Sequence, residues 1–225
     1  MEWSDEFPDI TVWDDLVDLL ENPKVNGVFC ITTSYRNEPN PVEGRHDKIF
    51  PMFEFESHGT ISDMINMETE LLSFLGFGDE YHKIKYDLAS ELYGVSELEY
   101  DEEAKLCEDF GTCTMLTHFP QRTHPFWNMK QNEDDKNLFN KVDIIMHGQE
   151  TIGSAERAVN VDEMRDNFHT ISNGEYAGLL YNHFSKERVE AELEEYLKHD
   201  FFPRFGGGIG VTRMVRAMEM SGLLK

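Results

Sequence analysis

Residues 205–213 read FGGGIGVTR, with four glycines in five residues, then a valine, a threonine and an arginine. Because glycine has no side chain, such a stretch lets the backbone approach a ligand closely, and the start of the helix predicted behind it supplies free N–H groups. The spacing is neither GxGxxG nor GxxxxGK[ST], which excludes the Rossmann and P-loop motifs. Tight packing between a strand and a helix would require the same glycines, so the stretch alone leaves both interpretations open. Arg213 lies in the first turn of the predicted helix, where it could face the same ligand.

A second segment is predicted to form a long antiparallel hairpin. Residues 28–36 (VFCITTSYR) and 49–57 (IFPMFEFES) are rich in β-branched and aromatic residues, which is typical of strands. The loop between them holds two prolines and a glycine. Arg45 and His46 lie on this loop and form a cationic tip suited to the oxygen atoms of phosphates.

Charged side chains gather on one face of this hairpin. Side chains alternate along a strand, so residues two apart point to the same face. The charged residues at such positions are Arg36 and Glu38 on the first strand and Glu54 and Glu56 on the second. This face is predicted to bind a ligand, and a solvated face with cross-strand ion pairs is the alternative.

Elsewhere the pattern predicts the other elements of a single domain spanning residues 1–225. The predicted helices, with apolar residues at helical spacing, cover residues 12–20, 61–75, 79–94, 186–198 and the segment after residue 210. Further strands are predicted at residues 113–120 and 141–151, and residues 97–108 read as a charged, exposed stretch. Strands with helices packed outside them indicate an α+β fold built on an antiparallel β-sheet flanked by helices.

Residues 148–157, GQETIGSAER, place Glu150 seven residues before Arg157. Gly153 and Ser154 are predicted to break the strand, which would leave the two charged groups beside a turn. A lone pair at this spacing is typical of surface pairing. This segment therefore indicates a functional site only when it is considered together with the hairpin and the glycine-rich stretch.

The charge balance bears on the class of partner. Lys and Arg total 20 against 44 Asp and Glu, a formal net charge of −24 over 225 residues. A surface that grips nucleic acid usually carries a basic stripe, so this charge disfavours tRNA as a partner, although halophilic adaptation would give the same charge. The three cysteines form no CxxC pair, and no signal peptide or membrane span is visible. The sequence predicts a cytoplasmic protein without membrane contact.

Taken in order along the chain, these segments resemble the catalytic core of class II aminoacyl-tRNA synthetases. The similarity is to the aspartyl/asparaginyl branch and to its relative, ammonia-dependent asparagine synthetase. The hairpin SYRNE…GRHDKIFPMFEFE (residues 34–56) resembles motif 2 of that family, and FGGGIGVTR resembles motif 3. Between them, THFPQRTHPFWNM (residues 117–129) and GQETIGSAER resemble two further segments of the branch, and the whole resemblance covers residues 10–222.

The resemblance implies an ATP site, an amino-acid site and a magnesium site. The residues implied for ATP are Arg36 at the α-phosphate, Glu38 at the adenine edge, Arg45 and His46 at the outer phosphates, Phe50 stacked on adenine, Gly208 and Gly210 in the glycine strand, and Arg213 at the terminal phosphate. Those implied for the amino acid are Glu54 at its amino group and Arg157 with Ser154 at the polar end of an aspartate or asparagine side chain. Glu56 and Glu150 are implied as ligands of Mg²⁺, and Arg36 and Arg213 as the catalytic residues.

These implied roles agree with the chemistry of adenylate formation. Attack of a carboxylate on the α-phosphorus brings two anions together, so arginines and Mg²⁺ must absorb the growing charge. The substrate carboxylate is itself the nucleophile, and therefore no nucleophilic residue or general base is needed. The expected catalyst acts by positioning its substrates.

The sequence also departs from the family pattern. Ile49 stands where the family usually has a glutamate before the stacking aromatic. The sequence is expected to lack most of motif 1 and an anticodon-binding domain, which leaves a homodimer as an open expectation. Asp14 and Asp15 stand where the aspartate branch offers a lysine. Facing the pocket, they would repel a free aspartate side chain and accept a carboxamide or an amine, whereas facing solvent they would do neither.

The leading hypothesis is an ATP-dependent ligase that forms an amino-acid adenylate, namely an aspartate–ammonia ligase in which ammonia releases AMP. The alternative enzyme is a minimal asparaginyl- or aspartyl-tRNA ligase, or a paralogue that loads another acceptor. The loop at Arg45 and His46 and the PFW segment at residues 125–127 favour this alternative. A catalytically silent regulatory paralogue is the third hypothesis. Against it, one chain holds Arg36, Phe50, Glu150, Arg157 and Arg213 together.

Overall fold

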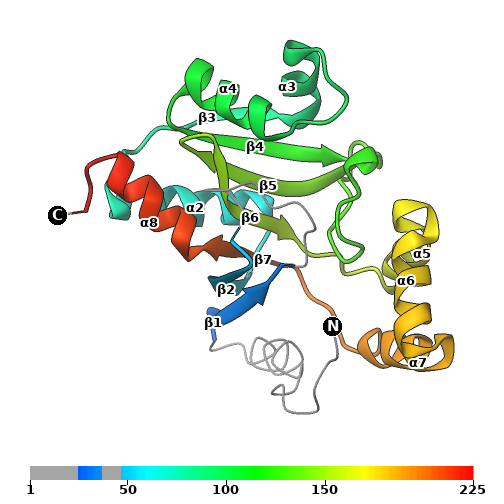
Figure 1. Cartoon of the computed structure of the whole chain (residues 1–225). Coiled ribbons are helices and arrows are strands. Elements are labelled where there is room, and N and C mark those ends of the chain that lie inside the picture. The colour runs from blue at the N-terminus through cyan, green and yellow to red at the C-terminus, as the bar shows by residue number, and fades with distance from the viewer. Residues whose placement is uncertain (1–24, 37–46, 225) are drawn as a thin grey trace.

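The structure is a computed structural model that describes residues 25–36 and 47–224. Its sheet has seven strands in the order β1-β2-β7-β6-β5-β4-β3 (Figure 1). The strands are β1 (Gly27–Tyr35), β2 (Ile49–His58), β3 (His82–Lys85), β4 (Cys113–Pro120), β5 (Leu138–Met146), β6 (Gln149–Glu156) and β7 (Arg204–Gly210). Neighbouring strands are antiparallel except β3 and β4, which run parallel. The predicted α+β fold is confirmed, and the sheet is mixed rather than wholly antiparallel.

The predicted hairpin and glycine strand lie side by side. β1 and β2 pair from Gly27 opposite Ser57 to Tyr35 opposite Ile49, which confirms the hairpin. β7 pairs with β2 on one side and with β6 on the other, so the glycine strand lies near the middle of the sheet. The order of the strands in the sheet thus places the hairpin, the glycine strand and the strand that contains Glu150 side by side.

One face of the sheet is covered by α2 (Ile61–Leu75) and α8 (Val211–Met220), which lie beside each other in Figure 1. Their apolar side chains, with Leu72 fully buried, pack against Phe55, Ile152 and Ile209 of the sheet. The prediction of a helix at residues 61–75 is confirmed. The helix begins after Thr60, whose backbone N–H donates to the Asp63 carboxylate as part of a capping box.

Among the described residues, the helices that cover the opposite face are α3 (Tyr86–Tyr93) and α4 (Tyr100–Phe110), which lie at its β3–β5 end (Figure 1). Leu106 of α4 packs there with Leu116 and Ile145. These two helices do not extend over β2 and β7 on this face. The polar side chains predicted for the site lie there.

Two predictions for this region are wrong. Residues 79–94 do not form one helix, because His82–Lys85 extends to pair in parallel with Thr114–Thr117 before α3 begins. Residues 97–108 are not an exposed stretch, because α4 buries Leu106 completely and Glu102 almost completely. In both cases tertiary packing outweighs the local charge pattern.

Between β6 and β7 the chain forms a helical unit of α5 (Val161–Thr170), η2 (Ile171–Gly174), α6 (Glu175–Phe184) and α7 (Lys186–Tyr196). The unit has its own apolar core, in which Met164, Phe168, Val189 and Leu193 pack with Trp127 at its edge. The predicted helix at residues 186–198 is confirmed as α7, whereas α5 and α6 had no counterpart in the prediction.

The predicted strand at residues 141–151 is a hairpin of two strands, β5 and β6. The turn between them uses the positive φ angles of His147 (47°) and Gly148 (76°). Gly153 and Ser154 do not break the strand, contrary to prediction, because both pair within β6 with residues of β5 and β7. Glu150 and Arg157 therefore lie at opposite ends of one strand.

The predicted helix at residues 12–20, which includes Asp14 and Asp15, lies outside the described residues. Within the part of the chain that the structure describes, the helices are too short or too polar to cross a membrane.

Candidate active site

The glycines of β7 clear space on both faces of the sheet. A Cβ added at Gly206 would lie 2.1 Å from Glu56 Oε1, and one at Gly208 would lie 2.6 Å from Met52 Cε. The side chains of β2 thus lie across the bare glycine backbone on the open face. On the core face, a Cβ at Gly207 would lie 2.6 Å from Ser154 Cβ. On the core face Gly207 allows close packing between neighbouring strands rather than between a strand and a helix, and on the open face Gly208 and Gly210 line a cavity.

A cavity of about 280 Å³ lies at the end of the glycine strand next to α8. Its lining includes six residues that the resemblance implied for ATP or magnesium, namely Arg36, Phe50, Glu150, Gly208, Gly210 and Arg213. These residues come from β2, β6, β7, α8 and the end of β1. The fold therefore gathers groups that are far apart in the sequence into one space.

Two guanidinium groups line this cavity. Arg36 follows β1, where its backbone N–H donates to the Lys48 carbonyl at 2.8 Å, and its Cζ lies 5.2 Å from the centre of the Phe50 ring. Arg213 lies in the first turn of α8, and its Nη1 donates to the backbone carbonyl of Glu150. Two guanidinium groups beside one cavity offer the positive charge and the hydrogen-bond donors that an anion such as a phosphate requires.

Two carboxylates converge beside the cavity, over Gly153. A Cβ at Gly153 would lie 2.7 Å from Glu150 Oε1 and 3.4 Å from Asp143 Oδ1. The strands slip in register between Ile144 and Ile145, and this irregularity turns Glu150 to the same face as Gly153. A regular strand would instead turn Glu150 to the core face with Ile152.

Asp143 is the residue of this pair that the sequence analysis missed. It is buried, its Oδ2 accepts from Lys141 Nζ, and its Oδ1 has no hydrogen-bond partner among the described residues. Burial raises the pKa of Asp143, and the ammonium group of Lys141 opposes that rise. The signal in the sequence was an aspartate inside the otherwise apolar run VDIIM at residues 142–146.

A second polar cluster lies at the other end of the glycine strand. Glu56, only 5% exposed, accepts from Arg157 Nε at 2.8 Å, and Arg157 Nη2 lies 2.6 Å from the same oxygen. Arg204 Nε lies 3.7 Å from Glu56 Oε2. Glu56 is opposite Gly206, whereas the Glu150 end of the strand is at Gly210, about 13 Å away at 3.3 Å per residue. The implied role of Glu56 as a ligand of Mg²⁺ does not fit this arrangement, because its carboxylate is held by Arg157 and Arg204.

The remaining predicted residues fall in different places. Glu54 is opposite Gly208 and accepts from Thr32 Oγ1 at 3.1 Å, on the same face as the cavity. Ser154 points to the core face and donates to the Val142 carbonyl, so its hydroxyl does not reach the cavity. Glu38, Arg45 and His46 lie outside the described residues.

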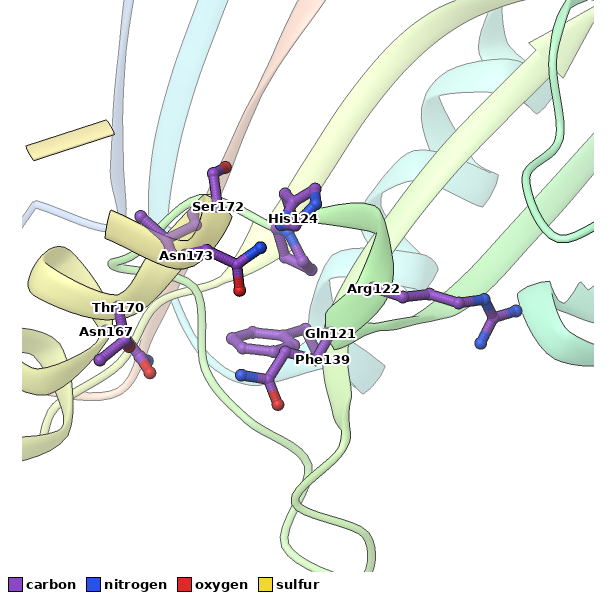
Figure 2. Close-up of a pocket in the computed structure, with 10 residues that line it drawn as sticks. Gln121, Arg122, His124, Phe139, Asn167, Thr170, Ser172 and Asn173 are labelled. Atoms are coloured by element: carbon purple, nitrogen blue, oxygen red, sulfur yellow. The ribbon is translucent and has the colours of Figure 1, made fainter. Parts of the chain in front are cut away.

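A separate cavity of about 320 Å³ lies between η1 (Gln121–Thr123) and the junction of α5 with η2 (Figure 2). It is lined mostly by neutral polar groups, among them Gln121, Asn167 and Asn173. Figure 2 shows Arg122 pointing away from the α5–η2 side chains, and its guanidinium pairs with Asp87. None of the described residues implied for ATP or the amino acid lines this cavity, so the cavity between Arg36 and Arg213 is the candidate site.

Comparison with known proteins agrees with this geometry. The sequence matches the model of the family "tRNA synthetases class II (D, K and N)" over residues 19–222. No curated protein matches the sequence.

Solved structures share the fold. Asparaginyl-tRNA synthetase from Pyrococcus horikoshii, complexed with asparaginyl-adenylate, is 22% identical with a TM-score of 0.69, covering 86% of this chain and 49% of that chain. Asparaginyl-tRNA synthetase from Entamoeba histolytica, also with asparaginyl-adenylate, is 17% identical with a TM-score of 0.74, covering 96% and 54%. Aspartyl tRNA synthetase from Entamoeba histolytica is 16% identical with a TM-score of 0.70, covering 93% and 47%. The chain spans about half the length of these structures.

Proposed function

Because this chain belongs to the family of class II tRNA synthetases for aspartate, lysine and asparagine, we propose that it is an ATP-dependent ligase that activates an amino acid as its adenylate. One observation carries the proposal. Arg36, Phe50, Glu150 and Arg213 line a single cavity beside the glycine strand.

In this proposal ATP occupies the arginine-lined cavity. Arg36 would bind the α-phosphate and Arg213 the terminal phosphate, so the nucleotide would lie bent between two cations contributed by distant parts of the chain. Phe50 would offer its ring to adenine, and Gly208 and Gly210 would let the nucleotide approach the sheet. The roles of Glu38, Arg45 and His46 at the adenine edge and the outer phosphates follow from the resemblance alone.

Asp143 and Glu150 are the residues that would hold Mg²⁺. Magnesium usually takes one or two protein carboxylates together with substrate phosphates. The open Oδ1 of Asp143 beside Glu150 Oε1 fits that requirement, although no group of three or more metal-binding side chains occurs within the described ranges. When bound, the ion would neutralise charge on the phosphates as pyrophosphate leaves.

The amino acid would lie next to the arginine-lined cavity on the open face of the sheet, with Glu54 at its amino group and Arg157 at the polar end of its side chain. Its carboxylate oxygen would attack the α-phosphorus and form the acyl phosphate bond, while the bond to the bridging oxygen breaks and pyrophosphate departs. Arg36 would stabilise the charge that grows on the α-phosphate oxygens. A carboxylate needs no deprotonation, so no residue has to act as a base.

For the substrate and acceptor we propose aspartate and ammonia. The side-chain carboxylate of aspartate would be activated, and the nitrogen of ammonia would then displace AMP and lose a proton to give asparagine. The net charge of −24 supports a small acceptor over a polyanion. A minimal asparaginyl- or aspartyl-tRNA ligase is the second candidate, and the solved structures that share this fold favour it.

Amino-acid-dependent exchange of pyrophosphate into ATP tests the proposal. The assay covers all twenty amino acids with Mg²⁺, and ammonia or tRNA is then added as acceptor. Exchange with aspartate and formation of asparagine from ammonia would support the full proposal. Transfer of the amino acid to tRNA would show that the acceptor is tRNA and would favour the second candidate, a minimal tRNA ligase. Binding of ATP without exchange for any amino acid would overturn both and indicate a catalytically silent paralogue.

A further inference from the structure

The cavity between η1 and the junction of α5 with η2 has no part in the function proposed above. Its volume of about 320 Å³ falls within the range of small-molecule sites in proteins. One wall is formed by residues 121–125, which follow β4, and the other by residues 167–173 of α5 and η2. The second wall belongs to the helical unit, which has its own apolar core. The cavity therefore lies at a junction between two packed parts of the fold, where ligand sites commonly occur.

Three carboxamide side chains line this cavity, those of Gln121, Asn167 and Asn173. Among the described residues, none of these carboxamides has a hydrogen-bond partner. Figure 2 shows the amide ends of Gln121 and Asn173 directed into the space between the two walls. Each carboxamide carries an N–H donor and a carbonyl acceptor side by side. The lining thus offers paired donors and acceptors that the protein itself leaves unused.

The charge of the lining bears on the class of ligand. Arg122 is the one permanently charged residue of the described lining, and its Nη2 donates to the Asp87 carboxylate at 2.5 Å. Figure 2 shows its guanidinium pointing away from the other wall. An anion would find no free guanidinium here, and a cation would find no carboxylate in the described lining. These features favour an uncharged ligand that forms hydrogen bonds.

The backbone is strained on both walls. His124 has a φ of 51° on one side, and Ser172 and Asn173 have φ angles of 50° and 55° on the other. Gly174 follows with a φ of 83°, so three successive residues are left-handed. Residues other than glycine usually adopt this conformation singly, and such strain is concentrated at ligand sites. The strained turn is what carries the Asn173 carboxamide to the cavity.

Flat rings complete the lining. Phe139, only 3% exposed, contributes its aromatic ring, and the imidazole of His124 lies on the wall formed by residues 121–125. Asparagine and glutamine side chains can bind two adjacent atoms on the edge of a nucleobase, and phenylalanine and histidine rings stack on its faces. A planar heterocycle with donors and acceptors on its edge therefore matches this lining.

We propose that this cavity is a second ligand site, which binds an uncharged nucleobase in the form of a nucleoside. The proposal is independent of the function proposed above. It differs from the ATP site in its chemistry, because Arg36 and Arg213 line that cavity whereas carboxamides line this one. The carboxamides would bind the edge of the base, and the ring of Phe139 or His124 would contact its face.

Nuclear magnetic resonance of the full chain labelled with ¹⁵N-asparagine tests the proposal. The side-chain amide signals of Asn167 and Asn173 are assigned by their loss in Asn167→Ala and Asn173→Gly. They report on this cavity, because the described lining of the arginine-lined cavity contains no asparagine. Titration with adenosine, guanosine, cytidine and uridine is expected to give saturable shifts of both signals for at least one nucleoside.

The same variants measure the contribution of each carboxamide. Glycine at position 173 removes the carboxamide and tolerates the left-handed backbone. Asn173→Gly, followed through the Asn167 signal, should raise the Kd of the accepted nucleoside about two- to tenfold, the effect of losing neutral hydrogen bonds. Asn182→Ala is the matched control, because Asn182 is exposed on α6 and does not line the cavity. Thermal unfolding shows whether each variant is folded.

Four results would overturn the inference. The first is the absence of saturable shifts with any of the nucleosides. The second is an equal response to ribose alone, which would identify a sugar site. The third is tenfold tighter binding of the 5′-monophosphate than of its nucleoside, which would identify an anion site. The fourth is an unchanged Kd in folded Asn173→Gly, and Asn167→Ala, followed through the Asn173 signal, decides if Asn173→Gly does not fold.

Discussion

Glu68 of α2 allows a sharp test of how the core holds the site. Its side chain is fully buried, and neither carboxylate oxygen has a hydrogen-bond partner among the described residues. Burial raises the pKa of Glu68 from 4.5 to about 8, against a smaller lowering by the nearby hydroxyl of Ser154 and together with a contribution from Asp143. The carboxyl group is therefore expected to be protonated in the folded protein at neutral pH.

The direction and size of the effect follow from proton linkage. The folded chain holds this proton more tightly than the unfolded chain, so its stabilising effect is complete below pH 4.5 and is lost as the pH rises to about 8. Each pH unit in that window lowers the free energy of unfolding by about 1.4 kcal/mol, or at most about 5 kcal/mol in all. Glu68→Gln cannot ionise, so its stability relative to wild type should increase by an amount of this order between pH 5 and pH 9.

Urea unfolding at pH 5, 7 and 9 measures this difference. Glu70→Gln is the matched control, because Glu70 is exposed on the same helix and should show no such change. Titrating groups that do not interact with Glu68 affect wild type and variant alike and cancel in the comparison, whereas Asp143, which interacts with Glu68, adds to the measured difference. An equal stability difference between wild type and Glu68→Gln at pH 5 and pH 9 would refute the assignment of a buried, protonated carboxyl group.

Further predictions concern the site and its glycine strand. Arg213→Ala should weaken ATP binding by about 1.5–3 kcal/mol, through loss of a charge-assisted phosphate contact, whereas Arg216→Ala on the same helix should not; the ATP dependence of exchange measures both. Asp143→Asn should raise the Mg²⁺ concentration needed for exchange about tenfold, and an unchanged requirement would exclude Asp143 as a ligand. Gly207→Ala should lower the free energy of unfolding by about 1–3 kcal/mol, because its Cβ would lie 2.7 Å from the Gly153 carbonyl oxygen, whereas Gly210→Ala, with its nearest contact at 3.7 Å, should change it little in the same urea titration.

The parts of the fold that sequence could predict have local signals. The hairpin at β1 and β2 alternates apolar and polar residues on either side of a loop with prolines, and the glycine run precedes an amphipathic helix. Such patterns depend on neighbours in the chain, and the structure confirms them. The cavity residues Arg36, Phe50 and Arg213 followed from the same segments.

The parts that sequence could not predict depend on contacts between distant residues. Asp143 lies beside Glu150 because β5 pairs with β6, and Glu150 faces the cavity only because of an irregular register that a strict alternation of side chains would miss. The contact of Arg204 with Glu56 could not be predicted, because the two residues are far apart in the sequence. Ser154 was wrongly expected at the site. Its neighbours along the strand face the open side of the sheet, but its own side chain points into the core.

The separate apolar core of α5–α7 has a consequence for how the site is reached. Tyr196, at the end of α7, is the hydrogen-bond partner of Arg204. A unit with its own core can open as a unit, with a free energy below that of global unfolding. Opening of these three helices would expose Arg204, which lies against Glu56 beside the sheet, to solvent while the sheet itself stays intact.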